Sequence, residues 1–510
     1  MENTFWNQLV ELNNLTLTEN GDKAYKSSLN GLMDLMFKAG VMKDRTDCQD
    51  MIKLFNQAWY ENPLYAIRLL FYIRDCRGGQ GCKLFFRSVM LYLSKYQPTV
   101  AKAIYSYIPE YGCWSDVIDM LKAPEFVLSK EMRKELYTMI ITQLSEDMIN
   151  MDKNKSVSLL FKWMPSENTS SKETVKLAKE LRNVMQLTSS EYRKILSAGR
   201  KYLDVVERKM CKNEFGKINY SAVPSVAMKN YNQAFLRHDE ERYNKFLDAV
   251  TLGKAKINAS VLYPYDVIKD VVNCDGTFII KDSTTLKQVE AQWKALPDFF
   301  NQKSDNSIVV ADVSGSMYGI PFKVCLSLAI YIAERNHGKF HNKFITFSAN
   351  PTLQELKGKT LAEKFYNLSN ANWSMNTDLS KVFELLYNAV TPETVKDMPS
   401  SIYIISDMQF DQCINNSKDT TYEYWKKKFK NDLNVDLPKV IFWNVSEIYN
   451  NVVPVTMKEN NTLLVSGFSP SIIKFIMEGA DNTLQLIEYI VLSNRYNKIL
   501  SEERMKELIS

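Results

Sequence analysis

Two patterns of hydrophobic and polar positions divide the chain near residue 300. Before that point, segments such as YAIRLLFYIRDC and EMRKELYTMIITQLSEDMI repeat apolar residues at three and four positions, which is typical of amphipathic helices. After it, short apolar segments alternate with amphipathic helices. Strands that are apolar on both faces indicate a mainly parallel sheet covered by helices. We therefore predict a multidomain α + α/β protein.

The second half contains five candidate strands, which read SIVVADVS, KFITFSAN, SIYIISDM, KVIFWNV and TLLVSGF. Helices at 322–336 and 379–390 separate some of them, so we expect a doubly wound, Rossmann-like sheet. The expected units are an N-terminal extension at 1–24, a helical domain at 25–300 and an α/β domain at 301–510. Ligands in such sheets bind beyond the carboxyl ends of the strands.

One helix, expected at 188–212, carries a prediction about charge. Thr188 with Glu191 forms a capping box at its start, and Ser170 with Glu173 forms another for the preceding helix. At 100° per residue, the apolar side of the helix collects Ile195, Leu196, Leu203, Val206 and Met210, and the opposite side collects Arg193, Arg200, Lys201 and Arg208. Asp204 interrupts the basic side and can pair with Arg208.

Composition excludes several classes of protein. The chain has 510 residues, of which 45% are hydrophobic and 12% aromatic, so a sizeable core is expected rather than global disorder. No apolar run is long enough to span a bilayer, and the N-terminus lacks the pattern of a secretory signal. Eight scattered cysteines without a CxxC pair, and only three histidines, argue against a zinc module and a Ser-His-Asp triad. We expect a soluble cytoplasmic protein.

Charge is distributed unevenly along the chain. The net charge is only +5, but residues 151–260 carry 21 Lys and Arg against 12 Asp and Glu. Such an excess indicates either a solvated helical face or a surface for a polyanion.

Oxygen-bearing side chains gather at the ends of two expected strands. Asp312, Ser314 and Ser316 form D-x-S-x-S after the first strand, and Asp407 follows the strand SIYIIS. Thr377 and its neighbour Asp378 precede a helix. One carboxylate and several hydroxyls suit a hard cation such as Mg²⁺ or Mn²⁺. Turn and capping roles are the alternative for these residues.

This set resembles the metal-ion-dependent adhesion site of von Willebrand factor A domains. The resemblance implies that one divalent ion, Mg²⁺ or Mn²⁺, is held by Asp312, Ser314, Ser316, Thr377 and Asp407. In that family the serines and the threonine usually bind the ion directly and the aspartates often bind it through water. Asp378 would then be an outer residue that orients the ligands.

The helical half is similar to an uncharacterised Ro-like family, DUF2828. The resemblance is carried by segments that include IRDCRGGQG at 73–81, YGCWSDVIDML at 111–121, FKWMPSEN at 161–168 and VVERKMCKNEFGKINYSAVPSVAM at 205–228. It implies a HEAT-like helical repeat region, related to that of the Ro (TROVE) ribonucleoproteins, joined to a von Willebrand A domain. Ro proteins hold single-stranded RNA ends and structured small RNAs.

An RNA surface would draw on the basic residues of the helical half. The candidate contacts are Arg77, Lys83, Arg193, Lys194, Arg200, Lys201, Arg208 and Lys209. Tyr192 is one of several aromatic residues that could stack on bases, although a place in the helix-packing core is the more common role. Arg77 and Lys83 flank the glycine-rich CRGGQGCK, which we interpret as a helix-to-helix turn, with an anion-binding nest as the second option.

These observations favour a non-catalytic protein of Ro type. It would bind single-stranded or small structured RNA and carry one divalent ion in its A domain, where a protein partner could offer a carboxylate. The alternative is a metal-dependent scaffold for protein partners without RNA. A hydrolase is least favoured, because no general base can be placed near Asp312. No membrane partner is expected.

Overall fold

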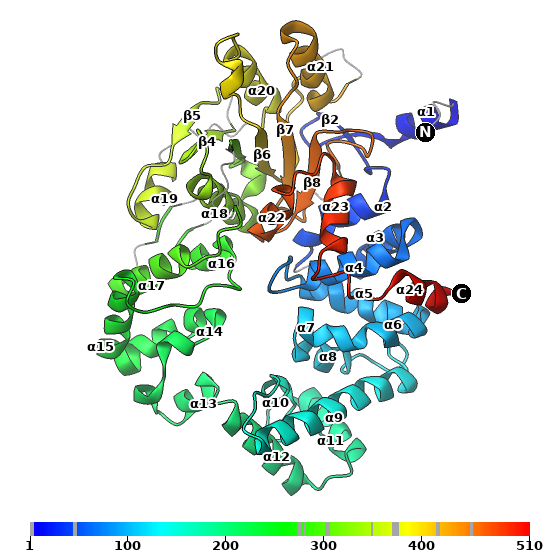
Figure 1. The fold of residues 1–510 in the computed structure, drawn as a ribbon, viewed down its shortest axis with the longest axis vertical. Helices are drawn as coiled ribbons and strands as arrows, with labels where there is room; N and C mark the ends of the chain where they lie inside the picture. The colour runs from blue at the N-terminus through cyan, green and yellow to red at the C-terminus, as the bar shows by residue number, and fades with distance from the viewer. Residues whose placement is uncertain are drawn as a thin grey trace.

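The computed structural model describes residues 5–43, 48–273, 277–279, 282–300, 306–347, 350–369, 377–414, 419–448 and 452–510. Figure 1 shows that the helices of the first 300 residues form an arc whose two ends meet the α/β domain. They leave the α/β domain through α3 to α9, turn at α10 to α12, and return through α13 to α17. The chain therefore meets its own C-terminal domain at two junctions, one at each end of the helical path.

Several of the outgoing helices, among them α2, α4 and α9, start at a side-chain cap. Asn62, for example, accepts a hydrogen bond from the amide of Tyr65 and precedes a proline at the first helical position, which is a favourable helix start. These helices are α2 (Gly31–Lys38), α3 (Cys48–Glu61), α4 (Pro63–Arg74), α5 (Lys83–Tyr96), α6 (Pro98–Ile104), α7 (Ile108–Tyr111), α8 (Trp114–Met120) and α9 (Lys130–Asp152).

The returning helices are shorter and pack partly on a second core. They are α10 (Leu160–Trp163), α11 (Lys172–Val184), α12 (Ser189–Tyr202), α13 (Val206–Cys211), α14 (Ser225–Asn230), α15 (Asn232–Thr251), α16 (Pro264–Ile268) and α17 (Ser283–Lys294). Phe235, Tyr243 and Leu247 of α15 belong to a hydrophobic cluster that is separate from the main core. The main core, by contrast, runs without a break from the first helices into the sheet.

The C-terminal domain is a six-stranded sheet in the order β5-β4-β3-β6-β7-β8. All neighbouring strands are parallel except β5, which pairs antiparallel with β4. The strands are β3 (Ser307–Ala311), β4 (Lys343–Thr346), β5 (Leu353–Glu355), β6 (Ser401–Ser406), β7 (Lys439–Asn444) and β8 (Thr462–Ser466). The five strands expected from sequence are confirmed, and β5 is an addition.

Every residue of β3, β6 and β8 is buried, so both faces of the sheet are covered. Helix α18 (Ile320–Arg335) packs along β3, β4 and β6, and α2 packs against β7 and β8. The remaining helices of the domain are α19 (Leu361–Ser369), α20 (Leu379–Asn388), α21 (Thr421–Leu433), α22 (Ile473–Ile476), α23 (Thr483–Leu492) and α24 (Glu502–Ile509). The structure is thus helical first and α/β second, as the sequence predicts.

The first junction joins the outgoing helices to strand β8 and to the C-terminal segment. Arg68 of α4 is 6% exposed, and its guanidinium donates to the backbone carbonyls of Val491, Asn497, Ile499 and Leu500. Gly40 lies so close to the end of β8 that an added Cβ would stand 2.7 Å from the Ser466 hydroxyl oxygen. A larger residue would push the helices off the sheet.

The chain begins with helix α1 (Phe5–Asn14) and a hairpin of β1 (Leu15–Leu17) and β2 (Lys23–Tyr25). The hairpin lies against the α/β domain, where Tyr25 and Val453 exchange backbone hydrogen bonds of 2.9 and 2.7 Å. At the second junction, the Lys323 ammonium donates to the carbonyl of Lys269 at 2.9 Å. No helix in the described part of the chain is both long and apolar enough to cross a lipid bilayer.

The expected helix at 188–212 is wrong in its length. It is broken into α12 and α13 because Asp204 adopts a left-handed backbone with φ of 47°. Asp204 pairs with Lys209 at 2.7 Å rather than with Arg208. The buried positions of α12 are Tyr192, Leu196 and Gly199, and no residue of α13 is fully buried.

Of the two expected capping boxes, the one at Thr188 is confirmed, with Glu191 bonding back to the Thr188 amide at 2.8 Å. The other is wrong by one residue. Ser171, not Ser170, caps α11, and its side chain accepts from the Thr174 amide at 3.3 Å. Only Ser170 has a glutamate three residues later, so the capping-box pattern favours it, but serine is a good N-cap residue at either position.

Candidate functional site

The oxygen-bearing residues lie where the order of the sheet reverses direction. The chain passes from β3 to β4 on one side and then crosses to β6 on the other side of β3. Strands β3 and β6 are parallel neighbours, with Ala311 opposite Ile405. The loops that follow the two strands therefore leave the sheet side by side, which is the usual position of a ligand site in this class of fold.

Asp312 is the first residue beyond β3 and has no exposed surface. Its amide donates to the carbonyl of Ile405 at 3.1 Å, so the strand pairing continues to this residue. One carboxylate oxygen accepts from the Ser314 amide at 2.9 Å, and the other accepts from the Ser406 hydroxyl at 2.5 Å. Burial, followed by the charge of Asp407, raises the pKa of Asp312 to about 7.

Ser314 and Ser316 turn their hydroxyls toward one another at the start of a short 3₁₀ turn. Their oxygens are 3.0 Å apart. Two adjacent ligands of an octahedral Mg²⁺, with bonds of about 2.0–2.1 Å, are separated by about 3 Å. Gly315 between them is exposed, and an added Cβ would meet nothing within 4 Å. The turn thus faces solvent while its hydroxyls face the strand ends.

Asp407, beyond β6, is the counterpart of Asp312. One carboxylate oxygen accepts from the Gln409 amide at 3.1 Å, while Oδ2 is buried and has no hydrogen-bond partner. Burial raises the pKa of Asp407, and the neighbouring Ser316 hydroxyl opposes that rise. No ion pair is recorded for Asp312 or Asp407 within the described ranges. These two buried carboxylates therefore repel one another without forming an ion pair to a described lysine, arginine or histidine.

Thr377 reaches the same rim from the loop before α20. It is 1% exposed, and its amide donates to Asp411 Oδ2 at 2.8 Å, with its hydroxyl 3.5 Å from Asp411 Oδ1. The next residue, Asp378, caps α20, where its carboxylate accepts from the Lys381 amide at 2.9 Å. The structure thus connects Thr377 to the β6 loop through Asp411.

Sequence reasoning missed three residues of this rim: Ser406, Asp411 and Asn20. Ser406 and Asp411 flank Asp407 closely in sequence, so the loop SDMQFD carries a signal for both. Asn20 lies in the N-terminal hairpin, and its amide nitrogen is 3.5 Å from the Thr377 hydroxyl oxygen. A contact across 357 residues leaves no local pattern in the sequence.

The donor set of oxygen atoms fits a hard divalent cation better than a softer metal such as zinc or copper. It offers two carboxylates and three hydroxyls, with one buried carboxylate oxygen unpaired. In the part of the chain that the structure describes, no group of three or more His, Cys, Asp or Glu side chains could hold a metal. An ion at this rim would therefore depend on the hydroxyl oxygens, which suit Mg²⁺ or Mn²⁺.

The basic candidates of the helical half fall into two groups. Lys83, Arg193, Lys194 and Lys201 are exposed. Arg208 is half-buried, and it lines a pocket of about 550 Å³ together with Arg193. Cations that remain accessible to solvent are available for phosphate contacts.

Other basic candidates already make polar contacts within the protein, although Arg77 is exposed. The Arg200 guanidinium donates to the carbonyls of Phe161 and Met164 and to the Ser166 hydroxyl. Lys209 pairs with Asp204. Arg77 donates to the carbonyls of Glu110 and Gly112 at 2.8 and 3.3 Å. Their charge contributes to the basic excess, but some of their donors already bind acceptors within the protein.

The glycine-rich segment at 76–83 is a helix-to-helix turn between α4 and α5, as we expect. Gly81 has φ of 66°, a conformation that glycine adopts without strain. The amides of Gly79 and Gly81 donate to the carbonyl of Asp75, and the Arg77 amide donates to its carboxylate. Because these amides point inward, they do not form an anion-binding nest.

Tyr192 is fully buried, and its hydroxyl donates to the carbonyl of Pro165 at 2.8 Å. The packing alternative is therefore confirmed for this residue.

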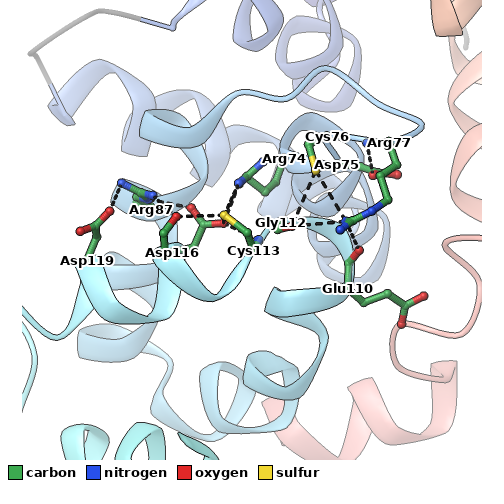
Figure 2. Close-up of polar contacts among 11 residues, drawn as sticks. Arg74, Asp75, Cys76, Arg77, Arg87, Glu110, Gly112, Cys113, Asp116 and Asp119 are labelled. Carbon is green, nitrogen blue, oxygen red and sulfur yellow. Dashed lines mark hydrogen bonds and ion pairs between the residues drawn. The ribbon is translucent and has the colours of Figure 1, made fainter. Parts of the chain in front are cut away.

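A second buried polar cluster lies between α4, α5 and α8 (Figure 2). Asp116 has no exposed surface, and its Oδ2 accepts from Arg74 Nη2 at 2.7 Å while its Oδ1 accepts from Arg87 Nε at 2.7 Å. Although burial alone would raise it, these guanidinium groups hold the pKa of Asp116 below its usual range. Arg87 also pairs with Asp119 at 2.7 Å. This cluster is a closed charge network rather than an open site.

The fold and the rim define a two-part α + α/β protein with a polar site at the switch point of its sheet. Residues 18–124 and 167–305 match the model of a domain of unknown function, DUF2828, which supports the expected family for the helical part. Residues 306–507 match the model of another domain of unknown function, DUF7788. An uncharacterized protein of Acanthamoeba polyphaga mimivirus is 29% identical over 511 residues, covering 94% of this chain and 87% of the relative.

Proposed function

We propose that the α/β domain is a von Willebrand factor A-type domain that binds one Mg²⁺ or Mn²⁺ ion and uses it to bind a protein partner. The observation that carries this proposal is the buried pair of Asp312 and Asp407, which repel one another and leave Asp407 Oδ2 unpaired. Unpaired buried charge is costly, and a divalent cation would remove that cost.

Each rim residue has a distinct task in this proposal. Ser314, Ser316 and Thr377 supply neutral hydroxyl oxygens, while Asp312 and Asp407 supply the negative charge that attracts the cation. Ser406 and the Ser314 amide hold the Asp312 carboxylate in place. When bound, the ion supplies a positive charge with an open coordination position for a partner's carboxylate.

The surface beside the rim suits contact with a protein. Tyr318 and Ile320 follow the serine turn directly and are 72% and 42% exposed. Exposed aromatic and aliphatic side chains next to a charged anchor are typical of protein-binding surfaces.

The proposed activity is binding without catalysis. His337 and His341 lie on the segment that leads into β4, at the opposite end of the strands from Asp312. Both carboxylate oxygens of Asp312 and one of Asp407 accept hydrogen bonds from the amides and the hydroxyl that orient them.

The direct test is titration of the purified chain with Mn²⁺ followed by electron paramagnetic resonance, with Mg²⁺ as competitor. We expect one site in the unmodified chain and at least a tenfold loss of affinity in Asp312→Ala. Asp397→Ala is the matched control, because Asp397 is an exposed aspartate paired with Lys339 away from the rim. Equal affinity in Asp312→Ala and the unmodified chain would refute the site. Capture of a protein partner by the purified chain, with and without EDTA, then tests whether the ion is used for partner binding.

We propose RNA binding of Ro type as a second function, through a HEAT-like helical half. The supporting observation is the group of exposed cations on and after α12 that includes Arg193, Lys194 and Lys201, beside the pocket that Arg208 lines. Single-stranded or small structured RNA would be held mainly by its phosphates, so affinity would fall steeply with salt.

A filter-binding salt titration tests this second function. Arg193→Glu with Lys201→Glu should weaken RNA binding at least tenfold. The slope of log K against log salt concentration should become shallower, because about two fewer phosphates are contacted. Lys430→Glu on α21 is the control, since that lysine pairs with Asp436 in the other domain. If the double variant binds RNA as the unmodified chain does, α12 is not an RNA surface. If no RNA binds at all, the protein acts as a metal-dependent scaffold.

A further inference from the structure

The tip of the N-terminal hairpin lies on the loops that form the proposed cation site. The Thr18 hydroxyl donates to the carbonyl of Phe410 at 2.7 Å, and the Glu19 amide donates to the Gln409 side chain at 2.7 Å. Gly21 forms a backbone bridge with Asp411. These contacts join a segment within the DUF2828 match to loops within the DUF7788 match.

Asn20 at the tip of the hairpin touches two of the ligand-bearing loops at once. Its side-chain amide donates to the carbonyl of Gln409 at 2.7 Å and lies 3.5 Å from the Thr377 hydroxyl oxygen. The backbone amide of Gln409 donates in turn to the Asp407 carboxylate. The Asn20 amide therefore bridges the Thr377 loop and the Asp407 loop.

The contacts of Thr377 leave its hydroxyl in a defined orientation. Asp411 accepts from the Thr377 amide, and its other oxygen is 3.5 Å from the hydroxyl. A hydroxyl has one hydrogen and two lone pairs. With the hydrogen directed at Asp411 and one lone pair directed at Asn20, the second lone pair stays available for a cation.

We infer that Asn20 is a positioning residue for the cation site, and that docking of the N-terminal hairpin and binding of a divalent cation are linked. This inference rests on the proposed metal function. An ion that needs Thr377 and Asp407 together binds best when the hairpin holds their loops in register. By thermodynamic reciprocity, the bound ion stabilises the docked hairpin by the same factor.

The hairpin is anchored to the α/β domain beyond its tip as well, through Asp22 and Tyr25. Its tip is held by the hydrogen bonds of Thr18, Glu19 and Asn20, and Glu19 and Asn20 are exposed. Couplings between two sites of this kind are typically about 5- to 150-fold. The hairpin would thus report the state of the cation site to helix α1, which directly precedes it.

The test combines Mn²⁺ affinity with hydrogen exchange on the full chain. Asn20→Ala should weaken Mn²⁺ binding about 5- to 50-fold, whereas Asn13→Ala, a control at an exposed asparagine of α1, should leave it unchanged. In the unmodified chain, saturating Mn²⁺ should slow amide exchange across residues 15–25. That protection should be absent in Asp312→Ala. A residue with a merely structural role would not make hairpin exchange depend on the metal.

A second variant keeps the test independent of Asn20 itself. Thr18→Val removes the hydrogen bonds of the Thr18 hydroxyl with the Phe410 carbonyl and the Asp22 amide without changing Thr377. It should weaken Mn²⁺ binding in proportion to the hydrogen-exchange protection that the hairpin loses. If Mn²⁺ binds the unmodified chain but both variants bind equally well and exchange does not respond, the linkage is refuted and the cation site stands. If Mn²⁺ does not bind the unmodified chain, the cation site and the linkage both fall.

Discussion

Two clusters of buried charge in this protein are organised in opposite ways. Between α4, α5 and α8, the Asp116 carboxylate lies between the guanidinium groups of Arg74 and Arg87 (Figure 2). At the rim of the sheet, Asp312 and Asp407 are equally buried but face each other, and no cation pairs with them among the described residues. The first cluster is neutralised by charges of the protein itself, whereas the second would be neutralised by the proposed cation.

This difference separates a structural role from a binding role. Removing one partner of a closed pair leaves an uncompensated charge, so the protein is expected to lose stability. Removing one of two like charges relieves repulsion, so the protein is expected to gain stability while it loses its ligand. The same kind of substitution should therefore change the free energy of unfolding in opposite directions in the two clusters.

The largest effect is expected for Asp116→Asn. The variant leaves Arg74 buried without an anion, and the free energy of unfolding should fall by about 3–5 kcal/mol. Chemical denaturation measures this change. Asp119→Asn is the matched control, because Asp119 pairs with Arg87 at the partly exposed edge of the same network and should cost at most about 1 kcal/mol. Equal losses of unfolding free energy in both variants would show that the burial of Asp116 does not determine the effect.

Asp22 in the N-terminal hairpin is an intermediate case. Burial raises its pKa to about 6, against a hydrogen bond from Thr421 and the charge of Lys23, while Asp378 adds to the rise. The pKa of Asp22 in the folded protein lies above its unfolded value of 3.8. The free energy of unfolding therefore falls as pH rises from about 4 to 6, and it stays level at higher pH. The full loss is on the order of 3 kcal/mol.

Asp22→Asn should remove that pH dependence. The difference in unfolding free energy between the variant and the unmodified chain should grow from pH 4 to pH 6 and remain constant above it. Denaturant titrations at several pH values check this expectation. A difference that is already complete at pH 4 would mean that Asp22 stays ionised in the folded protein.

Asp407→Asn should stabilise the protein, whereas Asp116→Asn should destabilise it. In EDTA, the free energy of unfolding should rise on the order of 1 kcal/mol, because a neutral amide replaces a buried charge beside Asp312. Mn²⁺ binding should be lost in the same variant. A destabilised Asp407→Asn protein in EDTA would place this residue with the closed networks instead.

The smallest stability effect is expected on the basic surface. Lys194→Glu with Lys201→Glu changes two exposed side chains of α12 and should alter the free energy of unfolding by less than about 0.5 kcal/mol. Thermal unfolding in low salt is sufficient to measure it. A larger loss of unfolding free energy would indicate that these lysines stabilise the helix and are not simply free for binding.

The sequence predicts what depends on local pattern and neighbouring strands. The five parallel strands and the Asp312 loop follow from apolar runs that end in polar residues, because such runs have few other structures available to them. The Thr188 capping box follows from four residues. The break at Asp204 was not predicted, since a left-handed aspartate changes neither the hydrophobic pattern nor the charge.

The parts of the site that long-range contacts create could not be predicted. Asn20 and Thr377 are brought together only because the hairpin docks on the C-terminal domain. Similarly, the charge of Arg200 is visible in the sequence, but its three acceptors are not. Charge patterning therefore identifies a basic region and overestimates how many of its cations are free.

The Arg68 junction has a consequence for the order of events during synthesis. The guanidinium binds the carbonyl of Leu500, which lies 432 residues later in the chain. At about 5–20 residues per second, the ribosome needs about 20–90 s to deliver that acceptor after Arg68 has emerged. During this time α4 presents a bare arginine and an uncovered apolar face. Nascent chains of this protein are therefore exposed to aggregation for longest at their first helices, and a chaperone would be needed there first.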